Sequence, residues 1–127
     1  MSRMITENFS LDELACKCNC GANHIREGLV HRLQVIRDII KDRIIITSGV
    51  RCHEHNIAIT GEIDSYHLKG WAADWTVEEF KTLEWIAKTL LDNWSGGFHF
   101  YPRTIFPDGT IREAFCHTDI GPRRRWV

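Results

Sequence analysis

Long apolar stretches are missing from this sequence, and charge of neither sign is in large excess. No apolar run approaches the roughly 18 residues that a membrane-spanning helix requires, so we expect no membrane partner. The opening residues, MSRMITENFSLDEL, lack the apolar core of a secretory signal, which predicts cytoplasmic synthesis without a signal peptide. A formal net charge of −1 argues against a nucleic-acid partner, because phosphate contacts require an excess of positive charge.

The composition is that of one folded domain. The 127 residues are 43% hydrophobic and 26% charged, which is enough to fill a core and to cover it with a polar surface. We therefore predict a single domain over residues 1–127 and a monomer. The one basic run, the arginines at 123–125, is interpreted as a solvated tail.

Capping patterns and apolar spacing predict the helices. Ser10 with Glu13, and Thr76 with Glu79, each match a capping box, in which the two side chains hydrogen-bond the first free N–H groups of a helix. Apolar residues at helical spacing follow both patterns and recur in between. We expect helices that begin near residue 11 and extend over 27–42, 53–59 and 80–93.

Short β-branched or aromatic runs predict strands over residues 44–48, 72–75, 98–101 and 111–120. Pro107, Asp108 and Gly109 supply a turn between the last two strands. Because helices dominate the first half and a hairpin closes the chain, we predict an α+β fold. The N-terminal helices should pack on a small, mainly antiparallel sheet that ends in a C-terminal hairpin.

Five cysteines in a chain without a signal peptide indicate free thiols or metal ligands rather than disulfides. Two interpretations remain open for Cys16, Cys18, Cys20 and Cys52. These residues could form a four-thiolate structural zinc site, or they could remain free thiols, which their unusual spacing favours. A nucleic-acid-binding zinc protein built on them is disfavoured by the net charge.

Two histidines and one aspartate form a candidate catalytic zinc site. Such a site takes three protein ligands and leaves one position for water. His67 lies in a predicted turn before Gly70, and Asp74 lies in the strand that follows. His117 lies in the last predicted strand, where alternate residues share a face. Taken singly, each of these residues has an ordinary structural explanation, so their combination carries the hypothesis.

Several separated motifs, in this order along the chain, resemble the zinc D-alanyl-D-alanine carboxypeptidase-like family of peptidoglycan peptidases. That group is similar to phage L-alanyl-D-glutamate endolysins, vancomycin-resistance dipeptidases and the hedgehog signalling domain. The motifs are Ser65-x-His67-x-x-Gly70-x-Ala72-x-Asp74 and Phe115-x-His117-x-Asp119-x-Gly121-Pro122, together with TSGVRC at 47–52, GGF at 96–98 and the closing RRRW. The resemblance implies Zn²⁺ bound by His67, Asp74 and His117. It also implies that Arg51 and Ser65 meet the substrate, with Arg51 holding a carboxylate through its planar fork. A structural salt bridge is the alternative role for Arg51.

The sequence departs from the family pattern at the catalytic base. Characterised members carry an acid three residues before the last histidine, and here that position is Ala114. Glu113 is the nearest upstream carboxylate, at roughly 13 Å from His117 along a regular strand unless a bulge shortens the path. His99 is a second candidate, because a turn centred on Asp108 places it opposite His117. Asp119 is expected to orient a ligating histidine.

The resemblance implies a zinc metallopeptidase that cuts peptidoglycan stem peptides, of the D-Ala-D-Ala carboxypeptidase or L-Ala-D-Glu endopeptidase type. A phage lysis protein, released to the cell wall at lysis, is one setting that fits this reading. The rival interpretation, which Ala114 favours, is a non-catalytic zinc-containing module of the same fold that binds cell wall or peptide.

Overall fold

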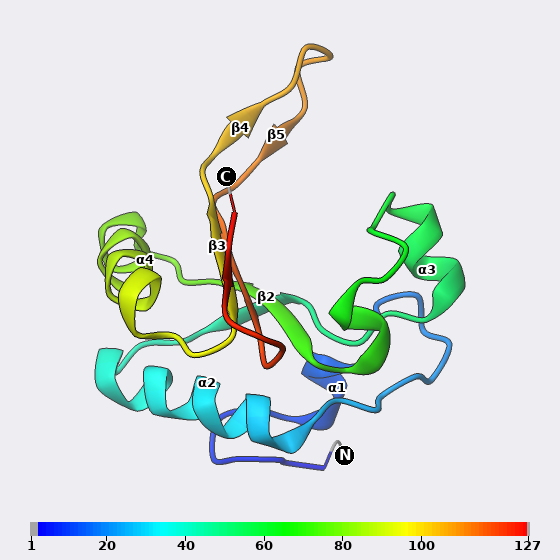
Figure 1. Ribbon diagram of the computed structural model, residues 1–127, viewed down its shortest axis with the longest axis horizontal. Coiled ribbons are helices and arrows are strands. Elements are labelled where there is room, and N and C mark those ends of the chain that lie inside the picture. Colours follow the sequence, from blue (N-terminus) through cyan, green and yellow to red (C-terminus); the bar gives the residue numbers. More distant parts are fainter. Residues whose placement is uncertain (1–2, 127) are drawn as a thin grey trace.

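A five-stranded sheet forms the centre of the computed structural model, which describes residues 3–126 (Figure 1). The strands lie in the order β1-β2-β6-β3-β7, and all neighbours are antiparallel except β3 and β7. The sheet strands are β1 (Ile45–Ser48), β2 (Ala72–Thr76), β3 (Gly97–Tyr101), β6 (Phe115–Asp119) and β7 (Arg124–Arg125). The predicted α+β class is confirmed.

Two long helices pack on one face of this sheet and enclose the core with it. The helices are α1 (Leu11–Leu14), α2 (Glu27–Ile40), α3 (His53–Ala58) and α4 (Phe80–Asn93), with a 3-10 turn, η1 (Tyr66–Lys69). Leu33 of α2 and Leu83 of α4 belong to the same apolar cluster as Trp75 and Phe98 of the sheet. Because side chains alternate along a strand, the residues between these core positions point to the other face.

The predicted helices, and the predicted strands up to residue 101, are confirmed to within a few residues, with one capping exception. The oxygen of Ser10 accepts the N–H of Glu13 at the start of α1, as the capping box predicts. The second capping box is wrong. Thr76 remains in β2 and its hydroxyl donates to the Ala114 carbonyl, so α4 begins after Glu79 without a side-chain cap. Pairing within the sheet therefore determines the conformation of Thr76, although the local sequence pattern favours a helix cap.

The last predicted strand is interrupted, which corrects the expected continuous run over 111–120. Residues 111–112 form β5 (Ile111–Arg112), which pairs with β4 (Thr104–Ile105) in a separate hairpin that projects from the body of the molecule (Figure 1). The chain then leaves the ladder at 113–114 and joins the main sheet as β6. The register predicted from the turn is confirmed, since His99 pairs with His117.

The C-terminal arginines are not a solvated tail, contrary to the prediction. Arg124 and Arg125 form β7 beside β3, and Arg125 donates to the carbonyl oxygens of Leu91 (2.8 Å) and Trp94 (2.6 Å). Arg123 also donates to the Trp94 carbonyl, at 2.7 Å. The last carbonyls of a helix have no partner within it, so these guanidinium groups close the end of α4.

None of the helices within residues 3–126 has the length and apolar character needed to cross a membrane.

Candidate metal centre

Three side chains meet on the sheet face opposite α2 and α4. His67 comes from η1, Asp74 from β2 and His117 from β6, and Asp74 lies directly opposite His117 in the strand pairing. One nitrogen or oxygen from each lies within 4.8 Å of the others, and all three residues are buried. We call this group the His/Asp/His cluster. The structure thus brings together the three ligands that the family resemblance implied.

The turn before β2 fixes His67. The oxygen of Ser65 accepts the N–H of His67 at 3.2 Å, and Gly70 ends the turn with a φ of 73°. A Cβ at Gly70 would lie 2.0 Å from the carbonyl oxygen of His24, so only glycine fits there. Nδ1 of His67 lies 2.7 Å from the carbonyl oxygen of Gly49 and donates to it. The opposite ring nitrogen, Nε2, therefore faces Asp74.

Asp119 holds His117 from behind. Nε2 of His117 donates to Asp119 Oδ2 at 2.8 Å, while Oδ1 accepts the N–H groups of Gly97 (2.9 Å) and Gly121 (3.0 Å). Asp119 is fully buried. Burial by itself raises the pKa of Asp119, but the contacts with His117 and these N–H groups hold that pKa below its ordinary value. Asp119 thus takes the orienting position that the sequence predicted for it.

Charge at Asp74 is balanced from two sides. Its Oδ1 lies 3.2 Å from Nε2 of His67 and 2.9 Å from Nδ1 of His117, and its Oδ2 accepts from Arg51 at 3.1 Å. Burial raises the pKa of Asp74, but the two histidines hold that pKa well below its ordinary value. The pKa of His117 is lowered by burial and raised more strongly by Asp119 and Asp74, so it lies above its usual range. The Asp74 carboxylate is therefore ionised.

The hydrogen-bond partners of the two rings show that the cluster fits a metal ion. The Gly49 carbonyl and the Asp119 carboxylate accept the N–H of His67 and of His117, respectively. A metal-bound imidazole is neutral and has only one N–H, so with these acceptors engaged Nε2 of His67 and Nδ1 of His117 would each offer a lone pair to an ion beside the ionised Asp74. Lone pairs facing a carboxylate repel unless a proton or a cation lies among them. Two imidazoles and one carboxylate are the donor set of a catalytic zinc, with a fourth position left for water.

Glu113 is not part of this cluster. Its carboxylate pairs with Arg103 at 3.3 Å, and its side chain is 75% exposed. The strand alternation that would have placed it on the same face as His117 ends at the break between β5 and β6. Ala114 itself is buried in the core. The sequence-predicted base is therefore held in the projecting hairpin by an ion pair.

His99 and Trp126 form an aromatic wall next to His117. The His99 ring stacks on Trp126, with ring centroids 5.1 Å apart, and meets the edge of Tyr101 at 4.4 Å. Trp126 in turn meets His117 at 5.3 Å. Burial, with a smaller contribution from the charge of His117, lowers the pKa of His99. Trp126 was quoted in the closing motif but given no role, because its contacts require β7 to return along β3.

Arg51 is anchored inside the protein. Its Nε donates to Ser48 at 3.0 Å and its Nη1 to Asn56 at 3.2 Å, in addition to the ion pair with Asp74. The structural salt bridge is thus present. Five N–H donors belong to a guanidinium, so some remain beyond these three contacts. Sequence reasoning gave no role to Ser48, which lies in the TSGVRC motif, or to Asn56, since their contacts with Arg51 exist only in the folded chain.

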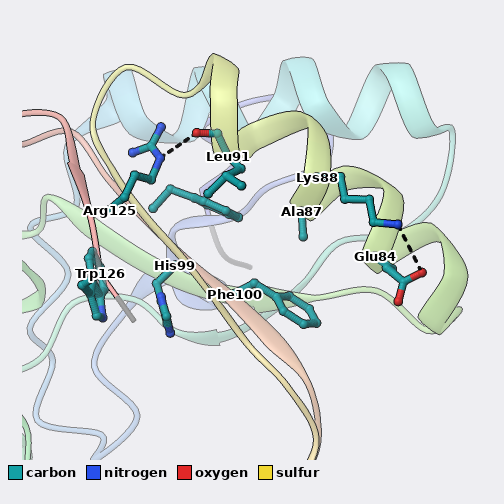
Figure 2. A pocket seen from close by; sticks show the side chains of 9 residues that line it. Glu84, Ala87, Lys88, Leu91, His99, Phe100, Arg125 and Trp126 are labelled. Atoms are coloured by element: carbon teal, nitrogen blue, oxygen red, sulfur yellow. Dashed lines mark hydrogen bonds and ion pairs between the residues drawn. The ribbon is translucent and has the colours of Figure 1, made fainter.

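A separate hollow of about 380 Å³ lies between α4 and the C-terminal end of the sheet. Figure 2 shows Leu91 of α4 on one side and His99 and Trp126 on another. The same two aromatic residues therefore border both this hollow and the His/Asp/His cluster. Ser65, by contrast, lies in neither wall of the hollow, and its oxygen is occupied by the cap of η1.

Together, the fold and the cluster define a small α+β domain that is built around a metal-ligand set. A model of the peptidase M15 family matches residues 7–105, and the chain belongs to this family of zinc-dependent peptidases. The resemblance to the zinc D-alanyl-D-alanine carboxypeptidase-like group is thereby confirmed. The match includes His67 and Asp74 and ends before His117, which the strand pairing places opposite Asp74. The comparison with curated proteins found no match.

Proposed function

We propose that this chain is a zinc metallopeptidase that hydrolyses a peptide bond in peptidoglycan stem peptides. The observation that carries the proposal is the buried His/Asp/His cluster in a chain of the M15 peptidase family. Bound zinc would polarise the scissile carbonyl and lower the pKa of a water molecule toward neutrality. The bond is of the D-Ala-D-Ala or the L-Ala-D-Glu type, and a phage lysis protein is one setting that fits this activity.

The residues around the cluster have separate roles in this proposal. Asp119 and the Gly49 carbonyl fix the ring orientations, so that Nδ1 of His117 and Nε2 of His67 point at the metal position. The N–H groups of Arg51 that remain free would hold the substrate carboxylate near Asp74. Ser65 supports His67 through the cap of η1 rather than through a substrate contact.

His99 is our candidate for proton transfer. It lies directly opposite His117 in the strand pairing, whereas Glu113 is engaged by Arg103 in the hairpin. An imidazole held near the metal position accepts a proton from water and returns it to the leaving amine. Stacking on Trp126 limits the ring to one orientation.

Release of amino groups from purified cell wall tests the activity. Zinc-loaded protein should generate new free amino groups, and a His67→Ala variant should not. His99→Gln should retain zinc and lose about 10²-fold or more in kcat, which is the usual contribution of general acid–base catalysis. Glu113→Gln, the matched control, should retain zinc and most of the turnover. Full activity of His99→Gln together with loss in Glu113→Gln would reverse this assignment.

A non-catalytic binding module is the second candidate function, and Ala114 is the observation that favours it. The family acid is missing at this position, and the side chain that replaces it is buried in the core. Co-sedimentation with cell wall, without release of amino groups from several wall chemistries by the zinc-loaded protein, would support the module and refute the peptidase.

A further inference from the structure

Four cysteines gather outside the His/Asp/His cluster. Cys16, Cys18 and Cys20 follow α1, and Cys52 immediately precedes α3. Their sulfur atoms all lie within 4.8 Å of one another, although Cys18 and Cys52 are 34 positions apart in the sequence. We call this group the cysteine cluster. The fifth cysteine, Cys116, lies in the sheet and is fully buried.

The sulfur separations match shared binding of one ion. Sγ of Cys18 lies 3.4 Å from that of Cys16 and 3.6 Å from that of Cys52. A disulfide would require about 2.0 Å, and all of these cysteines are free. Four sulfurs at about 2.3 Å around a tetrahedral zinc stand about 3.8 Å apart. The observed separations therefore lie close to those of a zinc site.

Backbone N–H groups point at the sulfur atoms of this cluster. Cys16 accepts from the N–H of Cys52 at 3.4 Å, Cys52 from His55 at 3.3 Å, and Cys20 from Ala22 at 3.5 Å. Hydrogen bonds of this kind stabilise negative charge on a metal-bound thiolate and fix its direction. Four thiolates at these separations would repel one another, so the ionised form of the cluster needs a positive centre.

We propose that Cys16, Cys18, Cys20 and Cys52 bind one zinc ion in a closed, structural four-thiolate site. Four protein ligands leave no position for water, so the site has no catalytic role. Soft thiolates select zinc over the hard cations Mg²⁺ and Ca²⁺. The ion ties the segment after α1 to Cys52, which adjoins Arg51. Since Arg51 contacts Asp74, the second metal would support the geometry of the first.

Zinc content, measured by mass spectrometry of the metal, tests this site without any substrate. Wild-type protein purified under reducing conditions should carry about two zinc ions per chain, one for each cluster. The Cys18→Ser/Cys52→Ser double variant should carry about one. His117→Ala should also carry about one, and the matched thiol control Cys116→Ala should keep about two.

X-ray absorption at the zinc edge of the His117→Ala variant identifies the ligands even if the cysteine variant fails to fold. Four sulfur neighbours at about 2.3 Å are expected. Cobalt(II) substitution of the same variant should give strong thiolate-to-cobalt absorption. A zinc shell without sulfur, two zinc ions in the double cysteine variant, or disulfides in the freshly reduced protein would overturn the proposal. Failure of the peptidase proposal would alter none of these readouts.

Discussion

The two clusters of this chain differ in what positions their ligands. The His/Asp/His cluster is buried, and two of its members face each other across the strands β2 and β6. The cysteine cluster lies in loops, with Cys18 and Cys20 exposed. A sheet register fixes side chains that are distant in sequence, whereas loop cysteines need the ion itself to complete their arrangement. We therefore expect the first cluster to keep its arrangement without metal and the second to depend on its ion for stability.

The ligand atoms of the two clusters also differ, and this difference suits one cluster to catalysis and the other to structural support. Three mixed nitrogen and oxygen ligands leave room for water, and four thiolates do not. The comparison predicts that removing a ligand from the first cluster abolishes activity. Removing a ligand from the second cluster should mainly lower the free energy of unfolding.

The largest expected effect comes from His117→Ala. This variant should lose zinc from the His/Asp/His cluster and all detectable hydrolysis, because one ligand and its link to Asp119 disappear together. Zinc analysis and the cell-wall assay measure both losses. His31→Ala, at an exposed position of α2, is the matched control and should change neither. Retention of both zinc ions in His117→Ala would contradict the site.

The next effect distinguishes the buried thiol from the cluster thiols. Burial, followed by the charge of Asp74, raises the pKa of Cys116 from 9.0 to about 12. Because the thiolate is the nucleophile, a shift of this size lowers the reactive fraction about 1,000-fold. Cys18 and Cys20 are also exposed, whereas Cys116 is fully buried. Alkylation of chelator-treated native protein, followed by peptide mass mapping, should therefore label Cys18 and Cys20 and leave Cys116 unlabelled until denaturant is added. Equal labelling of all five cysteines would contradict the predicted difference.

A smaller effect is expected from Gly97→Ala. An added Cβ would lie 2.3 Å from Asp119 Oδ2, so the carboxylate that orients His117 must move. We expect zinc affinity at the His/Asp/His cluster to fall about 10- to 100-fold, the usual effect of disturbing such a supporting group. Competition with a chromophoric chelator measures it. Gly28→Ala in α2, where an added Cβ meets nothing within 4 Å, is the control and should leave affinity unchanged.

The smallest effect is a pH dependence of stability in metal-free protein. The pKa of Asp119 is lowered, so its contribution is present above the unfolded value of about 3.9 and is lost as pH falls through the folded value. The pKa of His117 is raised, so its contribution is present below about 6.5 and is lost as pH rises through the folded value. Their contact should therefore stabilise most between about pH 4 and 6.5.

Urea unfolding of metal-free wild type and Asp119→Asn measures this contribution. We expect a difference of about 2 kcal/mol within that range and a decrease on either side of it. Zinc-loaded protein should instead become more stable as pH rises through this range, because His117 must lose a proton to bind metal. A difference independent of pH would contradict the assigned ion pair.

Much of the fold was predictable because local patterns and tertiary packing agree. The helical spacing in α2 and α4 and the turn at Asp108 predicted these elements and the His99–His117 register. Prediction failed where a local pattern competed with a distant partner. Thr76 matched a capping box but hydrogen-bonds to Ala114 across the sheet. The C-terminal arginines read as a tail but close α4, which lies next to them only in the folded chain.

The sequence by itself determined the residue types of the site and their order, because motif spacing encodes which side chains leave each turn and strand. His67, Asp74 and His117 could be named from it. Only the tertiary structure decided which carboxylate stands near them. Glu113 is separated from the metal position by the break between β5 and β6 and by its pair with Arg103, while Asp119 supports His117. Distances between side chains depend on strand pairing and on where pairing ends, which a linear pattern does not specify.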